Sequence, residues 1–395
     1  MPKKTVRDVD VQGKRVLVRV DFNVPLDKRT GRVTDVTRLR ASLPTIQYLR
    51  EHGATVILMS HLGRPKGKPQ PDLSLMPVAK ALEKLLGVPV QMAHDCVGPE
   101  AEATVRSLHP GDVLLLENLR FHPEEETNDP VFAQALAKLG DIYVNDAFGT
   151  AHRAHASTAG ITAYLPAVAG LLMEKELAAL GGILEDPRRP LVAIIGGAKV
   201  STKLGVLTHL VGRVNTLLIG GGMANTFFKA QGHEVGKSLL EADLVPAALD
   251  LMKQAEQRGV ALVLPTDVVV ADRVETGARS QTVPVGEIPA DLAVVDIGPK
   301  TIERFGQEID RAGTILWNGP MGVFEIPEFA AGTKAVAERL AASSAVTVIG
   351  GGESVAAVEQ LGLADRMTHV STGGGATLEF LEGRELPGVA ALNDT

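Results

Sequence analysis

The sequence contains a single cysteine, Cys96, and only 4% of its 395 residues are aromatic. One cysteine excludes an intrachain disulfide, and with it the disulfide framework of small secreted proteins. With so few aromatic side chains, the hydrophobic core has to be built mainly from valine, leucine, isoleucine and alanine. That composition suits parallel strands that are covered by helices on both faces.

Long apolar runs and a surplus of basic residues are also missing. No apolar stretch approaches the roughly 20 residues that a membrane-spanning helix needs, and residues 1–8 lack the apolar run of a signal peptide. The formal net charge is −7, and no block of Lys and Arg is interleaved with aromatic residues. We therefore expect a cytoplasmic protein that binds neither membranes nor nucleic acid.

What the chain does contain is a recurring unit of a short apolar strand, a polar or glycine-rich loop and a helical segment. This alternation is typical of parallel α/β sheets. Helical segments are expected, for example, at 77–86 and 246–258. The expected strands are 16–20, 55–59, 113–116 and 142–144 in the first part of the chain, and 191–195, 216–219, 261–264, 314–317 and 345–349 in the second.

The boundary between the two parts is expected at residues 171–190. The pattern predicts an amphipathic helix that begins near residue 171 and ends at Gly181 and Gly182, and two prolines follow at 187 and 190. We interpret this segment as a connecting helix with a short linker. The predicted fold is α/β, with two doubly wound (Rossmann-like) parallel-sheet domains, 1–170 and 191–377, joined by a hinge helix.

Arginines follow the strands of the first domain. Arg64, Arg120 and Arg153 each lie where a strand gives way to a loop, and Arg38 and Arg40 begin a helix after the first loop. Ligands of open α/β sheets bind beyond the carboxyl ends of the strands, and a guanidinium group fits phosphate and carboxylate. A single surface arginine is by default a solvated charge. Their repetition after successive strands predicts a small substrate with several negative charges.

Glycines follow the strands of the second domain, at 196–197, 220–222, 319 and 322, 350–352 and 373–375. Glycine lets the backbone approach a ligand, and helix N-termini offer free N–H groups to phosphates. One such loop could be an ordinary tight turn, but five in one domain indicate phosphate binding. Lys199 and Lys203 are four residues apart, so a helix there would place both on one face, although spacing alone favours an ordinary exposed pair.

Several other motifs are absent or weak. No stretch fits the P-loop pattern or the dinucleotide pattern G-x-G-x-x-G. His152 and His155 suggest a metal pair only weakly, because no cysteine or third histidine lies close in sequence. Asp267, Asp272 and Asp296 also follow strands, and helix caps or turns are the default interpretation. The residues alone therefore predict a layout for phosphoryl transfer between two substrates, which a binding protein could share.

Eight longer motifs make the prediction specific, and they occur in one order across essentially the whole chain. Together they resemble the signatures of phosphoglycerate kinases. The motifs are Asp21 to Pro25, Arg38 to Ile46, Ser60 to Pro65, Glu117 to Phe121, Asn145 to His155, Gly196 to Val200, Trp317 to Glu325 and His369 to Gly375.

The resemblance implies a set of site residues. In the first domain, 3-phosphoglycerate or 1,3-bisphosphoglycerate would be bound by Asp21, Asn23, Arg38, His61, Leu62, Gly63, Arg64, Arg120, His152 and Arg153. In the second, ADP or ATP would be bound by Gly197, Lys199, Lys203, Asn318, Glu325, Gly350, Gly351, Gly352, Glu353 and Ser354. Arg38, Lys203, Gly374 and Gly375 would be catalytic, and Glu353 would bind Mg²⁺. The resemblance further implies a monomer whose residues 378–395 return to the first domain.

The implied chemistry needs no general base, because the nucleophile in the ATP-consuming direction is a carboxylate that is already ionised. Positioning and charge neutralisation would have to supply the rate. Two half-sites on separate domains also imply closure, with the helix near 171–184 as a hinge. One residue departs from the family pattern: Glu353 stands where the resemblance leads us to expect Asp. The alternative is a non-catalytic nucleotide- or anion-binding protein on the same fold.

Overall fold

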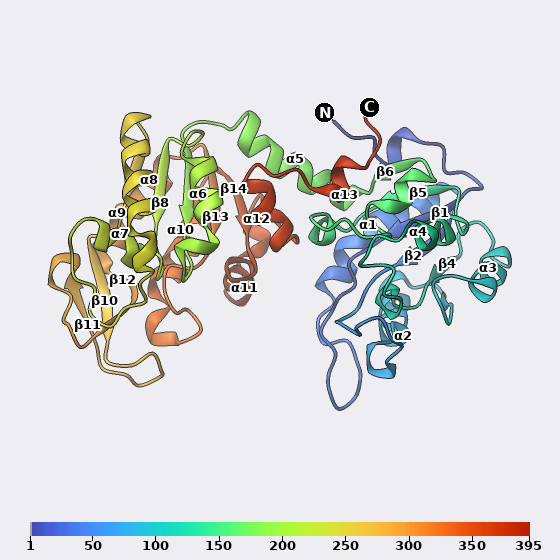
Figure 1. Ribbon diagram of the computed structural model, residues 1–395, viewed down its shortest axis with the longest axis horizontal. Coiled ribbons are helices and arrows are strands. Elements are labelled where there is room, and N and C mark those ends of the chain that lie inside the picture. Colours follow the sequence, from blue (N-terminus) through green and yellow to red (C-terminus); the bar gives the residue numbers. More distant parts are fainter. Residues whose placement is uncertain (1) are drawn as a thin grey trace. The chain divides into compact units, whose positions relative to one another are not determined.

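The computed structural model describes residues 2–395, which divide into two compact units. The first unit comprises the chain up to Ala178 together with Glu385–Thr395, and the second is Ala179–Arg384. Each unit is built on its own parallel sheet (Figure 1). No helix in residues 2–395 has the length and apolar character needed to cross a membrane.

The first unit contains a six-stranded sheet in the order β3-β4-β2-β1-β5-β6, and every neighbouring pair is parallel. The central strands are almost entirely buried, as expected where helices cover a parallel sheet. The strands are β1 (Arg15–Arg19), β2 (Thr55–Met59), β3 (Val90–Met92), β4 (Val113–Leu115), β5 (Ile142–Asn145) and β6 (Ala167–Ala169).

The helices of the first unit begin and end where their sequences indicate. In α2, Pro77 occupies the first turn, where a missing N–H costs nothing, and Gly87 ends the helix at φ 68°, a left-handed conformation that favours glycine. Its Val78 and Leu82 join the buried core over the sheet. The helices are α1 (Thr37–Glu51), α2 (Met76–Leu86), α3 (Pro99–Arg106), α4 (Pro130–Ala137), α5 (Leu171–Glu185, which runs on into the second unit) and α13 (Pro387–Ala390).

The second unit contains a six-stranded parallel sheet in the order β15-β14-β13-β7-β8-β9 and a smaller antiparallel sheet in the order β11-β10-β12. The parallel strands are β7 (Leu191–Ile195), β8 (Thr216–Ile219), β9 (Ala261–Val263), β13 (Thr314–Asn318), β14 (Val346–Gly350) and β15 (His369–Val370). The antiparallel strands are β10 (Asp267–Ala271), β11 (Ser280–Pro284) and β12 (Ala293–Ile297).

Helices of the second unit pack beside these strands (Figure 1). The largest buried side chain is that of Trp317 at the end of β13, and its indole N–H donates to the Gly319 carbonyl at 2.8 Å. The helices are α6 (Leu204–Leu210), α7 (Ala224–Ala230), α8 (Val245–Gln257), α9 (Pro299–Arg311), α10 (Ala331–Ala342), α11 (Gly352–Gln360) and α12 (Gly375–Leu381).

The predicted fold class, two parallel-sheet α/β domains, is confirmed. Three features differ from the sequence-based expectation. Strands β3, β6 and β15 were not predicted, because each has only two or three residues, and the antiparallel sheet, in which β11 is mostly exposed, was not predicted either. The connecting helix was expected to end at Gly181 and Gly182, and this was wrong, since α5 continues to Glu185.

The N-terminal end of α5 is fixed by a buried carboxylate. Oδ1 of Asp146, in the loop after β5, accepts hydrogen bonds from the backbone N–H groups of Leu172 at 2.9 Å and Met173 at 3.3 Å. The Oδ2 atom is buried without a hydrogen-bond partner. Burial raises the pKa of Asp146 to about 7. The loop after β5 is therefore tied to the first turn of α5 by an acid that titrates near neutrality.

The raised pKa of Asp146 predicts that the free energy of unfolding depends on pH. Between pH 4 and 7 the folded protein keeps Asp146 protonated while the unfolded chain ionises it, so stability falls as pH rises through this window. Asp146→Asn keeps the accepting oxygen but removes the ionisation. We expect the variant to lose less free energy of unfolding than the wild type from pH 4.5 to 7.5, by on the order of 2 kcal/mol. Guanidinium unfolding at several pH values measures this, and parallel curves would contradict it.

Candidate functional site

The anion-binding residues expected in the first unit are organised around a fully buried arginine at the end of β1. The Nη2 atom of Arg19 lies 3.2 Å from Nδ1 of His61, and its Nε donates to the Ser157 hydroxyl at 2.8 Å. Ser157 in turn donates to the buried carboxylate of Glu125 at 2.6 Å. These hydrogen bonds keep the charged guanidinium of Arg19 in the interior, next to His61 in the loop after β2.

His61 is thereby held as a neutral donor. Burial and then the charge of Arg19, followed by those of Arg120, Arg153 and Arg38, lower its pKa well below the usual value. Because Arg19 can only donate, the Nδ1 atom that faces it has to accept, so the ring proton sits on Nε2. The imidazole therefore presents an N–H group, which suits a ligand carboxylate or phosphate.

Arg120 is a second buried cation, and its hydrogen bonds are incomplete. Its residue is 4% exposed, and Nη1 donates to the Gly63 carbonyl at 3.1 Å. Nε and Nη2 are buried without hydrogen-bond partners, and the nearest carboxylate oxygen, of Glu126, is 3.7 Å from Nε. Burying unpaired donors of a charged group costs free energy, so this guanidinium is set up to bind an anion.

Arg38, Asp21 and Asn23 form a connected group at the first loop. Nη1 of Arg38 donates to Oδ1 of Asp21 at 3.0 Å and to the Asn23 carbonyl at 3.1 Å, while the Arg38 side chain stays 42% exposed. The Asn23 side-chain oxygen accepts from the N–H of Gly63 at 2.9 Å. These bonds link the loop after β1 to the loop after β2, where His61, Leu62 and Gly63 lie.

The remaining expected residues of this unit are less tightly placed. Arg153 donates from Nε to Nε2 of His152 at 3.4 Å, and Arg64 is exposed. Burial and the neighbouring charges of Arg120 and Arg19 lower the pKa of His155 to about 4. Within the described residues, neither histidine belongs to a group of three possible metal ligands.

Sequence reasoning missed two residues that position this loop cluster. Asn118 donates to the carbonyl groups of Leu62 at 2.8 Å and Leu73 at 2.9 Å and accepts from the N–H of Arg120 at 3.1 Å. Arg19 was missed because it lies inside an apolar strand. A charge that interrupts the strand 16–20 was the only sequence signal for Arg19, and Asn118 carried none beyond its place in a motif.

In the second unit, the glycine loops pack against one another. A Cβ atom at Gly196 would lie 2.2 Å from the Pro320 carbonyl oxygen, and one at Gly319 would lie 2.2 Å from that of Gly196. A Cβ at Gly221 would lie 2.5 Å from the Gly197 oxygen. These contacts are backbone to backbone, so part of the glycine pattern is explained by loop packing and not by the approach of a ligand.

Lys203 and Asn318 form the polar centre of these loops. The ammonium group of Lys203 donates to the side-chain oxygen of the fully buried Asn318. Burial lowers the pKa of Lys203, and the charge of Glu353 acts in the opposite direction. A short 3-10 turn, Val200–Thr202, precedes α6, so Lys199 and Lys203 do not share a face of one α-helix.

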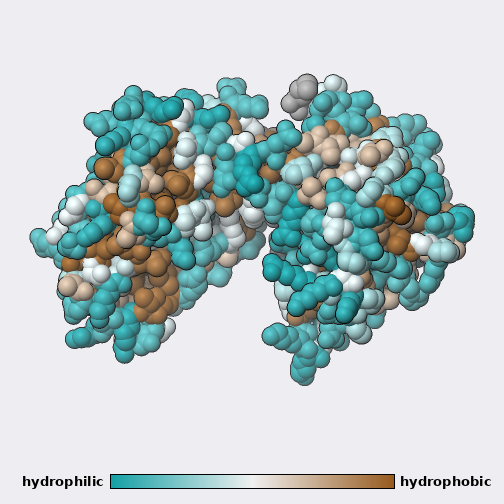
Figure 2. All heavy atoms as spheres, viewed as in Figure 1, coloured by the Kyte–Doolittle hydropathy of each residue, from teal (hydrophilic) through white to brown (hydrophobic). Residues whose placement is uncertain are grey.

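An apolar cavity of about 480 Å³ opens beside these loops. Figure 2 shows apolar side chains gathered on this unit near β10 and β12. Two of its lining residues, Leu239 and Val274, are exposed hydrophobic residues. Its lining is Gly197, Ala198, Gly221, Gly222, Lys237, Leu239, Val274, Ala293, Val294, Val295, Asp296, Pro320, Met321, Gly322, Val323, Glu325 and Glu353.

Only Gly197, Glu325 and Glu353 of the residues expected at the nucleotide line this cavity. Lys199 is exposed, and the Ser354 hydroxyl accepts from the N–H of Gly319 at 2.6 Å, which ties two of the loops together. Gly350 and Gly351 lie against other residues, since a Cβ at Gly351 would be 3.1 Å from Nδ2 of Asn318. That Nδ2 atom is buried without a hydrogen-bond partner.

Three of the expected glycines and two of the aspartates singled out in the sequence have still to be located in the structure. Gly352 and Gly374 are exposed, and Gly375 begins α12 after Gly374 at φ 49°. Asp267 caps α9, as the default interpretation held, by accepting from Lys300 and Thr301 N–H groups at 3.0 and 2.8 Å. Burial raises the pKa of Asp296 to about 7, and its carboxylate accepts from the N–H of Gly332 at the start of α10.

Two parallel-sheet units, one with the buried cations Arg19 and Arg120 and one with an apolar cavity beside a lysine and glycine loops, fit a two-domain phosphotransferase. A family model described as phosphoglycerate kinase matches residues 6–384. The chain belongs to the phosphoglycerate kinase family, as its motifs indicated. A non-catalytic protein on the same fold is not favoured.

Relatives resemble the chain along its entire length. It is 63% identical to a phosphoglycerate kinase of Chloroflexus aurantiacus and 60% identical to one of Moorella thermoacetica, with 100% of each chain covered. The structure of phosphoglycerate kinase from Coxiella burnetii is similar with a TM-score of 0.91 and 43% identity, covering 99% of this chain and 98% of that one. The structure of phosphoglycerate kinase from Pyrococcus horikoshii is similar with a TM-score of 0.84 and 34% identity, covering 98% of this chain and 98% of that one.

Proposed function

We propose that this chain catalyses the reversible transfer of the acyl phosphate of 1,3-bisphosphoglycerate to ADP, which gives 3-phosphoglycerate and ATP. The observation that carries the proposal is the incompletely bonded, buried guanidinium of Arg120 beside the neutral His61, in a chain of this family. A buried cation with unused donors needs an anion to complete its hydrogen bonds, and a phosphorylated glycerate supplies two anionic ends.

On the substrate side, each residue would have a distinct part. The phosphate and carboxyl ends of the glycerate would be held by Arg120 and His61, together with Arg64, His152 and Arg153. Asp21 and Asn23 would accept from its hydroxyl, since the carboxylate of Asp21 is already oriented by Arg38. Leu62 and Gly63 would form the backbone wall that Asn118 and Asn23 fix.

On the nucleotide side, the apolar cavity would take the base and sugar of ADP or ATP, with Leu239, Val295 and Met321 against the base and Glu325 at the sugar. The phosphates would be bound by Lys203, Asn318, Gly197, Lys199 and the loop Gly350 to Ser354. The unpartnered Nδ2 of Asn318 points to a missing acceptor, as a phosphate oxygen would provide.

The exposed carboxylate of Glu353 lines the cavity and lies near enough to Lys203 to influence its pKa. An oxygen donor at that place fits a magnesium ion carried by the nucleotide. Bound there, Mg²⁺ would supply positive charge to the phosphate oxygens. Glu353 itself would orient the metal-bound nucleotide, while the ammonium group of Lys203 would interact with the transferring phosphoryl group.

No general base is needed, because the acceptor in the ATP-consuming direction is an ionised carboxylate. Arg38 on one substrate and Lys203 on the other, with the N–H groups of Gly374 and Gly375, would stabilise the charge of the phosphoryl group in transfer. Since the half-sites lie in different units, transfer requires closure that also excludes water. Residues around α5 would act as the hinge, and scattering curves that stay unchanged with both substrates present would argue against this.

The decisive measurement is turnover. ATP-dependent phosphorylation of 3-phosphoglycerate, coupled to NADH oxidation through glyceraldehyde-3-phosphate dehydrogenase, should give sustained activity that depends on Mg²⁺. Folded protein that binds ATP without turnover would overturn the proposal in favour of a non-catalytic binding protein. The same preparation should behave as a monomer in light scattering. We also propose a cytoplasmic location, which fractionation of cells would test.

Glu353 gives a prediction for the metal-bound nucleotide. It is one methylene longer than the aspartate of the family pattern, but it retains the charge and the oxygen donors that Mg²⁺ requires. We expect Glu353→Asp to keep turnover within about fivefold, and Glu353→Gln to weaken the apparent affinity for Mg-ADP by roughly tenfold or more. Calorimetric titration at fixed Mg²⁺ tests both. Much tighter binding by Glu353→Asp would show instead that the native glutamate is a handicap.

A further inference from the structure

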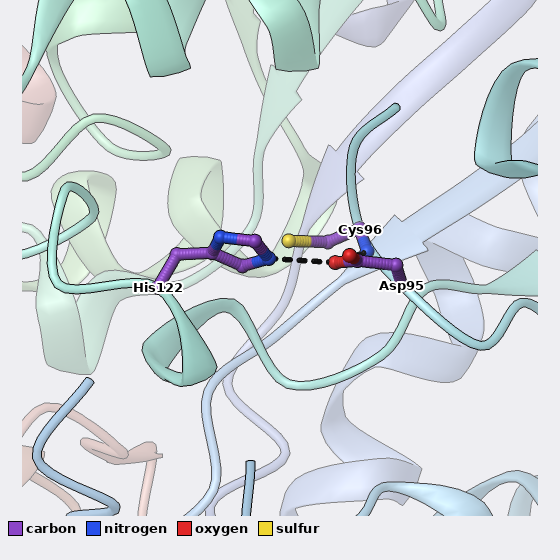
Figure 3. Close-up of side chains that lie close together, drawn as sticks. All are labelled: Asp95, Cys96 and His122. Carbon is purple, nitrogen blue, oxygen red and sulfur yellow. Dashed lines mark hydrogen bonds and ion pairs between the residues drawn. The ribbon is translucent and has the colours of Figure 1, made fainter. Parts of the chain in front are cut away.

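The loops that follow β3 and β4 bring together three side chains for which the proposed phosphoryl transfer has no use: Asp95, Cys96 and His122 (Figure 3). A carboxylate oxygen, the Sγ atom and an imidazole nitrogen all lie within 4.8 Å of one another. In residues 2–395 this is the one group of three or more His, Cys, Asp and Glu side chains found at such spacing. We propose that it is a binding site for a thiophilic divalent metal ion, with Zn²⁺ as the best fit.

The donor set matches the chemistry of zinc. Zinc binds carboxylate oxygen and imidazole nitrogen at about 2.0–2.2 Å and thiolate sulfur at about 2.3 Å, so neighbouring ligands of a tetrahedral site lie roughly 3.2–3.7 Å apart. Nε2 of His122 is now 2.7 Å from Oδ1 of Asp95, in a hydrogen bond. An ion that replaces the shared proton has to move these two atoms apart by only about half an ångström.

The three ligands are already oriented. The ring of His122 lies against that of Phe132, with centroids 5.2 Å apart, and Oδ1 of Asp95 also accepts from the N–H of Cys96 at 2.6 Å. Figure 3 shows the sulfur atom directed toward the imidazole. Little conformational freedom is therefore left for an ion to remove when it binds, which favours affinity.

Access to the site is one-sided. Cys96 is fully buried, whereas the side chains of Asp95 and His122 are 45% and 29% exposed. An ion would enter past the carboxylate and the imidazole and meet the sulfur atom last. Three protein ligands leave the fourth tetrahedral position to water on the exposed side.

The surrounding charges suit a cation better than they suit a reactive thiol. Burial raises the pKa of Cys96 well above its usual value, and the charges of Asp95 and Glu125 add to that effect. Without metal the group is a neutral thiol and a poor nucleophile. On binding, the sulfur forms a bond to the ion and its proton leaves to solvent, and the two carboxylates offset the charge that the ion brings.

A metal ion here would join two segments that the chain keeps 26 residues apart, since Cys96 follows β3 and His122 follows the turn after β4. His122 lies two residues beyond Arg120. The site would therefore brace the loop that carries this arginine without using any residue of the proposed substrate site. Its effect should appear in stability first, because an ion that binds only the folded state stabilises it.

Cobalt gives a direct test because Cys96 is the only cysteine in the chain. A thiolate-to-cobalt charge-transfer band in the near ultraviolet can arise from this site alone. After dialysis against a chelator, we expect Co²⁺ to produce such a band with a stoichiometry of one, and Zn²⁺ to abolish it by displacement. A wild-type protein that shows no band at saturating Co²⁺ would overturn the proposal, whatever the variants do.

Variants then assign the ligands. Cys96→Ser should abolish the band, and His122→Gln should weaken cobalt affinity at least tenfold. The matched control is His109→Gln, since His109 also faces a carboxylate, that of Asp112 at 3.7 Å, but has no thiol beside it. Excess Zn²⁺ should raise the unfolding temperature of the wild type by roughly 5 °C and leave that of Cys96→Ser unchanged. An undiminished affinity in His122→Gln would contradict the site as drawn.

Discussion

Lys203→Ala should lower kcat by roughly a thousandfold while the protein stays folded. The lysine is half-buried, and its ammonium group donates to the side-chain oxygen of Asn318. Burial lowers its pKa, yet the charge of Glu353 helps to retain the proton. A partly buried cation interacts more strongly than an exposed one with the charge of a phosphoryl group in transfer, and alanine removes that interaction completely.

The separation of kcat from KM makes this prediction specific. If Lys203 acts mainly in the transition state, kcat and kcat/KM should fall together, whereas loss of simple nucleotide binding would raise KM alone. Lys253→Ala, which removes an exposed lysine from α8 in the same unit, is the matched control and should behave as the wild type. A Lys203→Ala enzyme within tenfold of wild-type kcat would remove this residue from the mechanism.

Arg38→Ala should cost about 10²- to 10³-fold in turnover. Arg38 combines a fixed position with a side chain that stays partly exposed. Its Nη1 atom is held by Asp21 and by the Asn23 carbonyl, while two-fifths of the side chain remains exposed to a ligand. Loss of the guanidinium removes the charge and also frees the Asp21 carboxylate to repel an anionic substrate.

The conservative replacement separates charge from geometry. Arg38→Lys keeps a positive charge but loses the planar fork, so we expect it to recover only part of the activity. Arg40→Ala lies on the same helix, is exposed, and should leave turnover unchanged. Full activity in Arg38→Lys would show that the proposed two-point geometry at this residue is unnecessary.

The fold was predictable because its parallel strands are buried on both sides and therefore appear as apolar runs followed by polar or glycine-rich loops. The same rule failed for β11, whose residues Ser280–Pro284 are mostly exposed and show no such run. It also failed at the end of α5, where the sequence pattern predicts a helix end at Gly181 and Gly182. Two consecutive glycines weaken a helix but do not forbid it, and α5 continues through them.

Candidate site residues could be named from the sequence only where they belong to continuous motifs. The cavity of the second unit draws Leu239, Val274 and Met321 from segments far apart in the chain, and each of them alone resembles an ordinary core or surface residue. Glycines were visible in the sequence, but whether a glycine makes room for a ligand or for another loop depends on its neighbour in space. Gly196 and Gly319 make room for each other's loops.

Residues 385–395 belong to the first unit although the entire second unit precedes them in the chain. Asn393 donates its backbone N–H to the Ala167 carbonyl, its side-chain oxygen accepts from the N–H of Ala167, and Lys3 pairs with Asp394 at 2.8 Å. A ribosome that makes this protein therefore completes the second unit before it delivers the last piece of the first. Synthesis from the N-terminus normally lets domains fold in order. Here the first unit is begun first but completed last, because its edge strand β6 pairs with residues that are made after the second unit.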